Sequence, residues 1–111
     1  MVNLNPVVGH EQGERRPCLV ISHDRLNHGP AELTIVIPIT STPRGIPYHV
    51  PVNPPEGGLT NTSYVMCEMI RSVSSGRLVE RRGAVTRMTL QQVEAQLIPL
   101  LNFSLPEHQR P

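Results

Sequence analysis

The segment from Gly9 to Ser22 gathers the side chains of this chain that are best suited to chemistry on a phosphate ester. It reads GHEQGERRPCLVIS, so polar and charged residues run directly into an apolar strand. Four side chains in this segment could bind a ligand or react with it: Glu11, Gln12, Arg15 and Arg16. Pro17 restricts the preceding residue to extended backbone, which would hold the Arg16 guanidinium at the mouth of the strand. A guanidinium fixed beside a carboxylate and an amide suits a phosphate group.

Cleavage of a phosphodiester without a metal is one reaction that these residue types could perform on RNA. It needs a base for the ribose 2′-hydroxyl proton, a cation for the developing charge and a donor for the leaving 5′-oxygen. Glu11 and Arg16 could supply the base and the cation. A hydroxyl from Thr40 or Ser41 could supply the donor if the strand ends meet. In the alternative interpretation, Arg16 forms a surface ion pair with Glu11 or Glu14, and Thr40 carries an ordinary strand-end hydroxyl.

The sequence favours a site without a metal or another cofactor. It contains no Walker loop, no GxSxG elbow and no HExxH motif. Four potential ligands lie close together without the spacing of a zinc site: His10, Cys18, His23 and His28. Asp24 is the only aspartate, which makes the clustered acids of a metal-dependent nuclease hard to assemble. Cys18 and Cys67 lie in apolar surroundings and are expected to be buried free thiols, not a disulfide.

Length and composition predict a single domain over residues 1–111, with a polar tail from about residue 104. No apolar run approaches the roughly 20 residues that cross a bilayer. No secretory leader follows Met1, so the protein is expected in the cytoplasm and away from membranes. The formal net charge of +1 is too small to indicate nucleic acid by itself, although every basic residue is arginine. The scarcity of aromatic residues argues against a platform for stacking successive bases.

Frequent prolines and glycines divide the chain into the short segments that are typical of a small β protein. Apolar, β-branched runs predict strands at 17–21, 33–39, 48–52, 64–70 and 83–85, with a remnant of a first strand at Asn3 and Leu4. The nearly continuous run at 33–39 is expected to be central, with an irregular end or an edge at Pro38. The loop after Thr40 carries Arg44, and it is either a ligand-covering loop or a plain solvated hairpin.

One helix is predicted toward the C-terminal end of the chain. It is expected to begin at Thr89, whose hydroxyl would cap it while Gln92 reaches back. Val93 and Leu97 lie on the apolar stripe that would close the barrel or sheet. Pro99 is expected to end or kink this helix close to residue 98.

Three ordered motifs resemble the MazF/PemK family of toxin endoribonucleases over nearly the whole chain, from Asn3 to about Leu101. They read NLNPVVGHEQGERRPCLVIS, VIPITS and SYVMCEMIRSVSSGRL. The resemblance implies a mainly β (α+β) fold, a small SH3-like antiparallel β-barrel with a C-terminal α-helix, assembled as a homodimer. It also implies the toxin of a type II toxin–antitoxin system, which cuts single-stranded RNA such as mRNA at short sequences. Cleavage would be metal-independent and leave 2′,3′-cyclic phosphate and 5′-hydroxyl ends.

The resemblance also implies partners and site residues. A cognate MazE-like antitoxin would inhibit the enzyme by laying an acidic segment over the RNA groove, and operator DNA could be bound through that complex. Carried over by position, the catalytic residues would be Arg16, Thr40 and Glu11. The RNA-binding residues would be Gln12, Arg15, Ser41, Arg44 and Arg71.

The chain departs from the family pattern in three places. Only Met1 and Val2 precede the NLNP motif, where a fuller first strand is usual. Glu14 adds a negative charge in the EQGE turn, and Met69 replaces an amide in the EMIR segment. Two other functions therefore stay open: a CcdB-like gyrase-binding toxin without catalysis, and a degenerate homologue that binds only an antitoxin or DNA.

Overall fold

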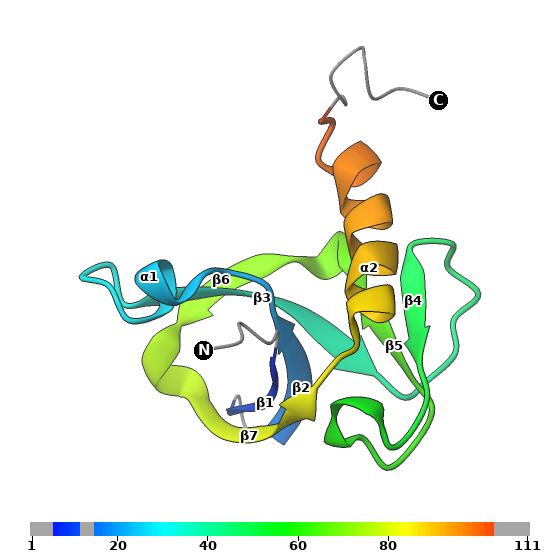
Figure 1. The fold of residues 1–111 in the computed structure, drawn as a ribbon, viewed down its shortest axis with the longest axis horizontal. Coiled ribbons are helices and arrows are strands. Elements are labelled where there is room, and N and C mark those ends of the chain that lie inside the picture. The colour runs from blue at the N-terminus through cyan, green and yellow to red at the C-terminus, as the bar shows by residue number, and fades with distance from the viewer. Residues whose placement is uncertain (1–5, 12–14, 104–111) are drawn as a thin grey trace.

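The computed structural model describes residues 6–11 and 15–103, which form a curled antiparallel sheet with a helix packed beside it (Figure 1). The strands are β1 (Pro6–Glu11), β2 (Arg15–Val20), β3 (Leu33–Thr40), β4 (His49–Val52), β5 (Ser63–Met66), β6 (Arg71–Ser74) and β7 (Leu78–Ala84). The α-helices are α1 (Asp24–Asn27) and α2 (Arg87–Leu100), and short 3-10 turns are η1 (Glu56–Gly58), η2 (Cys67–Met69) and η3 (Ser75–Arg77). The predicted mainly β fold with a C-terminal helix is confirmed.

Strand β3 is the centre of the sheet, as its apolar sequence predicts. The strand order is β4-β5-β3-β2-β1-β7, and β6 also pairs with β3. On one edge, β3 pairs with β6 as far as Val36 and with β5 from Ile39 onward. The gap between the two ladders contains Pro38, which has no N–H to donate, so the predicted irregularity is present although the strand is central.

The sheet is curled but open. In the described part of the chain, no ladder joins β7 to β4 or to β6. The turn η1 packs against β7 instead, so that a loop contact covers the seam where a closed barrel would have hydrogen-bonded strands.

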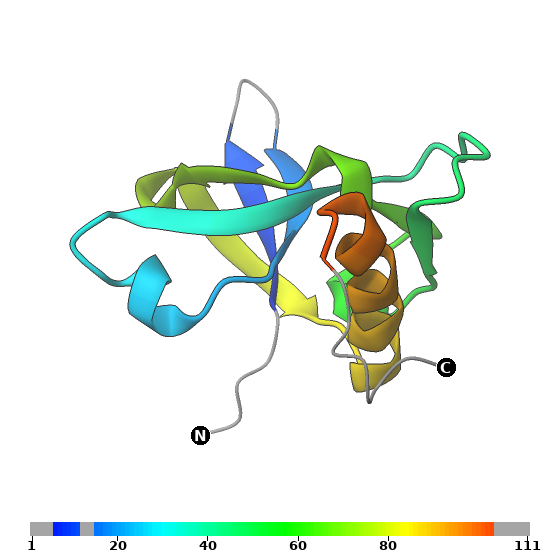
Figure 2. The ribbon, with the colours of Figure 1, turned by 90° about the horizontal axis from the view of Figure 1, so that it is seen from above.

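Alternating side chains of the strands bury two hydrophobic clusters, one on each face of the sheet. Val7, Leu19 and Ile37 belong to the larger cluster, which also receives Val93 of α2. Helix α2 lies beside β4 and η2 on this face (Figure 2). Each fully buried side chain of this size contributes about 1.5–3 kcal/mol. The smaller cluster on the other face contains Val8, Cys18, Val20, Val36 and Val73, with Leu78 packed against it.

Several elements differ from the sequence-based expectation. The polar segment that begins at Gly9 is not one loop but the adjoining ends of two paired strands, with Glu11 opposite Arg15. The strand expected at 83–85 is the end of the longer β7, and β6 and α1 were not predicted. Strands β6 and β7 depend on pairing partners that are distant in sequence, whereas α1 is a single turn capped by the adjacent His23, whose side chain accepts from the Arg25 backbone N–H. The proposed remnant at Asn3 and Leu4 lies outside the described residues. No described helix has the length and apolarity needed to span a membrane.

The start predicted for α2 is wrong by three residues. Thr86, not Thr89, is the N-cap: its hydroxyl accepts a hydrogen bond from the Thr89 backbone N–H at 3.2 Å. The carboxylate of Glu56 also accepts from the Thr86 backbone N–H at 2.8 Å, which fixes the cap to η1. The helix continues through Pro99 to Leu100, so it ends two residues beyond the expected position and Pro99 lies in its last turn.

Candidate active site

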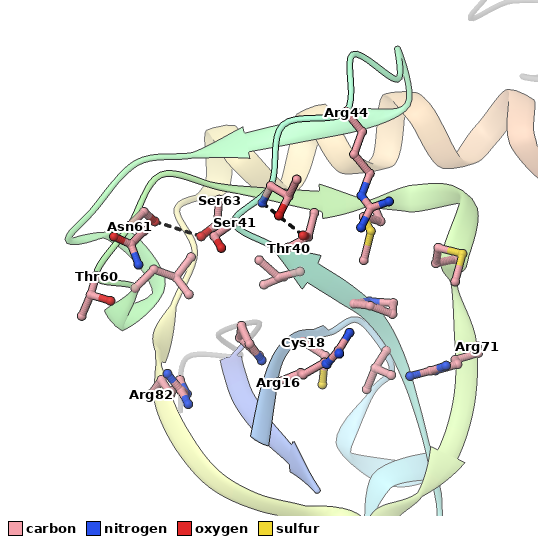
Figure 3. Close-up of a pocket in the computed structure, with 18 residues that line it drawn as sticks. Arg16, Cys18, Thr40, Ser41, Arg44, Thr60, Asn61, Ser63, Arg71 and Arg82 are labelled. Carbon is pink, nitrogen blue, oxygen red and sulfur yellow. Dashed lines mark hydrogen bonds between the residues drawn. The ribbon is translucent and has the colours of Figure 1, made fainter. Parts of the chain in front are cut away.

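A groove of about 980 Å³ opens on the face of the sheet that carries the smaller cluster (Figure 3). Its floor includes Cys18 on β2 and Val36 and Pro38 on β3. These residues alternate along their strands, so their side chains share one face of the pleated sheet. Residues at the next alternate positions toward the strand ends therefore enter the same groove.

Arg16 and Thr40 are those next residues. The ladder between β2 and β3 pairs Cys18 with Pro38. The ladder ends at this pair, Arg16 and Thr40 each lie two residues beyond it on their own strand, and both line the groove. Arg16 is exposed, whereas Thr40 is partly buried. The Thr40 hydroxyl oxygen accepts a hydrogen bond from the Thr42 backbone N–H at 3.2 Å, which leaves the hydroxyl proton available for donation.

Three more predicted residues line the groove: Ser41, Arg44 and Arg71. Ser41 directly follows β3, and Arg44 lies in the exposed loop between β3 and β4. Arg71 opens β6, where it pairs with Val36 of the groove floor. Arg44 and Arg71 thus bring two further guanidinium groups to the side of the groove that Figure 3 shows on the right.

Three predicted residues are described only in part or not at all. Glu11 and Arg15 pair through their backbones at the end of the β1–β2 ladder, one position from Arg16. Their side chains, and the whole of Gln12, lie outside the described part of the structure. The catalytic role of Glu11 and the RNA contacts of Gln12 and Arg15 therefore remain predictions.

The residues on the opposite side of the groove were not predicted from the sequence. Arg82 of β7 and the loop residues Thr60 and Asn61 line it there (Figure 3). The adjacent Arg81 and Arg82 were visible in the sequence, but β7 was predicted too short to place them. Nothing local indicates that the loop after η1 reaches the same groove as β7.

Cys18 forms part of the groove floor as a neutral thiol. Both cysteines are free and buried, as predicted. Burial raises the pKa of Cys18 to about 11, and the nearby positive charge of Arg71 offsets only part of that rise. Because the thiolate is the reactive form of cysteine, Cys18 serves packing and not nucleophilic attack near neutral pH.

His49 of β4 contacts a carboxylate of η2. Its side chain is only 4% exposed, and its Nε2 lies 2.8 Å from Glu68 Oε2. This contact joins β4 to η2, the turn that carries Met69. Met69 and Met66 line the groove next to this contact, so the methionine that departs from the family pattern lies where RNA contacts are expected.

Among the described residues, no three His, Cys, Asp or Glu side chains are grouped so as to hold a metal ion.

A curled β sheet with an arginine-lined groove and one C-terminal helix defines a small protein whose open face fits a polyanionic chain. Residues 1–101 match the family model described as the PemK-like, MazF-like toxin of type II toxin–antitoxin systems. The match spans most of the chain, which therefore belongs to this toxin family.

Two curated relatives are similar along most of their length. Endoribonuclease EndoA of Bacillus subtilis (strain 168) is 34% identical over 105 residues, covering 91% of this chain and 90% of EndoA. Endoribonuclease MazF9 of Mycobacterium tuberculosis (strain ATCC 25618 / H37Rv) is 32% identical over 101 residues, covering 86% of each chain.

Solved structures share the fold. A MazE–MazF crystal structure (Form-II) from Deinococcus radiodurans matches with a TM-score of 0.80 and 28% identity, covering 93% of this chain and 97% of that chain. The Mycobacterium tuberculosis toxin MazF-mt6 also matches with a TM-score of 0.80, covering 90% of this chain and 99% of that one. Its 21% identity supports the likeness of fold alone.

Proposed function

We propose that this protein is the toxin of a type II toxin–antitoxin system and acts as a sequence-specific, metal-independent endoribonuclease on single-stranded RNA. The observation that carries the proposal is the position of Arg16 and Thr40, which line one groove from the neighbouring strands β2 and β3. The curated relatives named above, both of them endoribonucleases, support the same activity.

The reaction that fits this pair is an attack by the ribose 2′-oxygen on the adjacent phosphorus. As the new P–O2′ bond forms, the 2′-hydroxyl proton passes to a base, for which Glu11 is the candidate. The P–O5′ bond breaks as the leaving 5′-oxygen takes up a proton from water, giving a 2′,3′-cyclic phosphate and a 5′-hydroxyl. Arg16 neutralises the charge that develops on the nonbridging oxygens and assists proton transfer. The Thr40 hydroxyl donates a hydrogen bond to a nonbridging oxygen.

The remaining predicted residues hold the RNA. Arg44 and Arg71 contact phosphates that flank the cleaved bond, and Ser41 contributes a hydroxyl beside Thr40. Gln12 and Arg15 are the candidate contacts next to Glu11. Guanidinium groups suit this task because each presents several donors to phosphate oxygens in a fixed plane.

The catalytic interpretation is favoured over a gyrase-binding protein and over a degenerate homologue. A protein that only binds gyrase, an antitoxin or DNA has no need of a guanidinium and a hydroxyl in one groove. Both groups are retained here on the face that an RNA chain would enter.

The partners follow from the same proposal. A MazE-type antitoxin inhibits the enzyme in the cytoplasm by covering the groove with an acidic segment, and the MazE–MazF structure from Deinococcus radiodurans supports such a pairing. The toxin acts as a homodimer, and operator DNA is bound through the antitoxin complex.

The test is incubation of the purified protein with a long single-stranded RNA in excess EDTA, next to the Arg16→Ala variant. The parent is expected to cut at short recurring sequences and to leave cyclic phosphate ends that mass spectrometry identifies. The variant is expected to lose cleavage by at least about 100-fold. An inactive parent, or a variant as active as the parent, contradicts the proposal. Gyrase-dependent DNA breaks without loss of RNA would support the gyrase-binding alternative.

A further inference from the structure

The side of the groove opposite Arg71 is lined by polar groups from two segments that are distant in sequence. Figure 3 shows Thr60, Asn61 and Arg82 on the same side of the groove, across from Arg44 and Arg71. All three are exposed. No carboxylate among the described residues forms an ion pair with Arg82.

Backbone contacts hold these two segments together. Gly58 has a φ of +68°, and a Cβ at this position would lie 2.1 Å from the carbonyl oxygen of Arg82. A Cβ on Gly83 would lie 2.7 Å from the backbone of Gly57 and Gly58. The chain of η1 therefore lies directly against β7, at the residue that carries the groove-lining guanidinium.

Side-chain hydrogen bonds fix the same loop on both sides of this contact. The Glu56 carboxylate accepts from the backbone N–H and hydroxyl of Thr86, at 2.8 and 3.2 Å. At the other end, the Thr62 hydroxyl donates to the Asn53 side-chain oxygen at 3.2 Å. Thr60 and Asn61 lie between these anchors, which limits the motion of their side chains relative to Arg82.

The side chain of Asn61 is suited to reading a base. Its described hydrogen bond uses only its backbone carbonyl, which accepts from the Ser63 hydroxyl at 2.9 Å. The amide thus keeps its donors and its acceptor for a ligand. An amide can bond two atoms on the edge of one base, and single-stranded RNA exposes such edges. None of the described residues that line the groove is aromatic, so recognition by this subsite depends on hydrogen bonds and not on stacking against a ring.

We propose that Arg82, Asn61 and Thr60 form a nucleotide-binding subsite that helps to set the cleavage sequence. Asn61 reads the edge of one base, Arg82 binds the adjoining phosphate, and Thr60 provides a further hydroxyl. The inference rests on the proposed function, because it requires single-stranded RNA in the groove. It assigns sequence selection to the η1–β7 side, away from the Arg16–Thr40 pair.

Binding is tested first with a random-sequence RNA oligonucleotide that is fully 2′-O-methylated and so cannot be cleaved. Arg82→Gln is compared with Arg81→Gln, a matched control on the neighbouring residue of β7 that is also exposed but does not line the groove. We expect Arg82→Gln to raise Kd about tenfold and to lower the slope of log K against log salt by about 0.7. Arg81→Gln should change Kd less than about twofold. Equal effects of the two substitutions would overturn the assignment of Arg82.

Selectivity is tested by sequencing the products from a random RNA library cut by the parent and by Asn61→Ala. In the products of the variant, the base preference at one position near the cut is expected to fall at least about fivefold. The slope of log K against log salt for RNA binding should stay unchanged. An unchanged cleavage profile would overturn the role of Asn61. A parent that binds the methylated RNA with the Arg82 dependence described above but cuts no RNA would contradict the proposed function while leaving the subsite intact. Matching thermal unfolding curves would exclude misfolding as the cause of any change.

Discussion

Arg16 and Thr40 lie on neighbouring strands, each two residues beyond the paired Cys18 and Pro38, and both line the groove. Pro17 keeps the backbone of Arg16 extended, and the Thr42 N–H orients the Thr40 hydroxyl. Both groups are therefore positioned by local backbone features at the ends of a shared ladder. Such an arrangement can hold a phosphate without a large rearrangement.

The hydroxyl of Thr40 is expected to be needed for catalysis, while its methyl group is not. Thr40→Val keeps the shape of the side chain but removes the donor, and single-turnover cleavage should slow at least about 100-fold. Thr40→Ser keeps the hydroxyl and should remain within about tenfold of the parent rate. Urea unfolding provides the control for folding. A Val variant that cuts as fast as the parent would remove Thr40 from the mechanism.

The contact between Gly58 and Arg82 is expected to make position 58 intolerant of any side chain. Gly58→Ala places a methyl group on a carbonyl oxygen, and we expect a loss of roughly 3 kcal/mol or more in the free energy of unfolding. Gly45→Ala is the matched control, because Gly45 also has a positive φ, +66°, but a Cβ at that position would have no atom within 4 Å. This control should lose only about 1 kcal/mol from backbone strain. Equal losses of unfolding free energy in the two variants would mean that η1 does not pack closely against β7.

The position of the helix cap can be tested by comparing two threonines. Thr86→Ala removes the hydroxyl that caps α2 and bonds Glu56, so the free energy of unfolding should fall by about 1–2 kcal/mol. Thr89→Val should cost less than Thr86→Ala, because the capping interaction uses the backbone N–H of Thr89. Chemical denaturation of both variants measures the difference. The opposite order would restore Thr89 as the cap.

The two buried thiols are expected to make the protein less stable at alkaline pH. Burial raises the pKa of Cys18 and of Cys67 to about 11 from a usual value of 9.0, and the negative charge of Glu68 adds to the rise at Cys67. Between pH 9 and 11 the unfolded chain loses these protons while the folded protein keeps them, so stability falls as pH rises. The contribution is fully present below pH 9. Each thiol accounts for roughly 2–3 kcal/mol of the fall.

Urea unfolding at pH 8.5 and pH 10.5, for the parent and for Cys67→Ala, measures this effect. The free energy of unfolding should decrease less between the two pH values in the variant than in the parent. The other titrating residues are common to both proteins, so they do not cause this difference. An identical decrease in both proteins would rule out Cys67 as a source of the pH dependence.

Residues that were named from the sequence make up one half of the groove lining, while their catalytic and RNA-binding roles stay predictions. Arg16 and Thr40 could be placed because Pro17 and the apolar run of β3 determine the backbone around them. The position of Arg44 could be predicted in the same way, because its loop directly follows the end of β3. The features that carry this information lie within a few residues of the side chains concerned.

The other half of the groove depends on contacts between distant segments. Asn61 and Arg82 line the same side of the groove because two glycines permit η1 to touch β7, and no local pattern encodes that contact. The N-cap was misplaced for the same reason: Thr89 and Gln92 match a capping box, but Glu56, 30 residues from Thr86, selects the earlier threonine. Strand β1 was missed because its polar end is stabilised by pairing with β2 and β7.

The pairing of β1 with β7 has a consequence for the synthesis of this protein on the ribosome. The ladder between residues 6–10 and residues 78–84 cannot form until residues 78–84 have been synthesised. Contacts of such long range are slow to close and cannot be made by a growing chain that stops short of them. A truncated product lacking β7 would leave β1 without its second partner and would carry only part of the groove. The complete groove therefore forms in the cell only after nearly the whole chain has been translated.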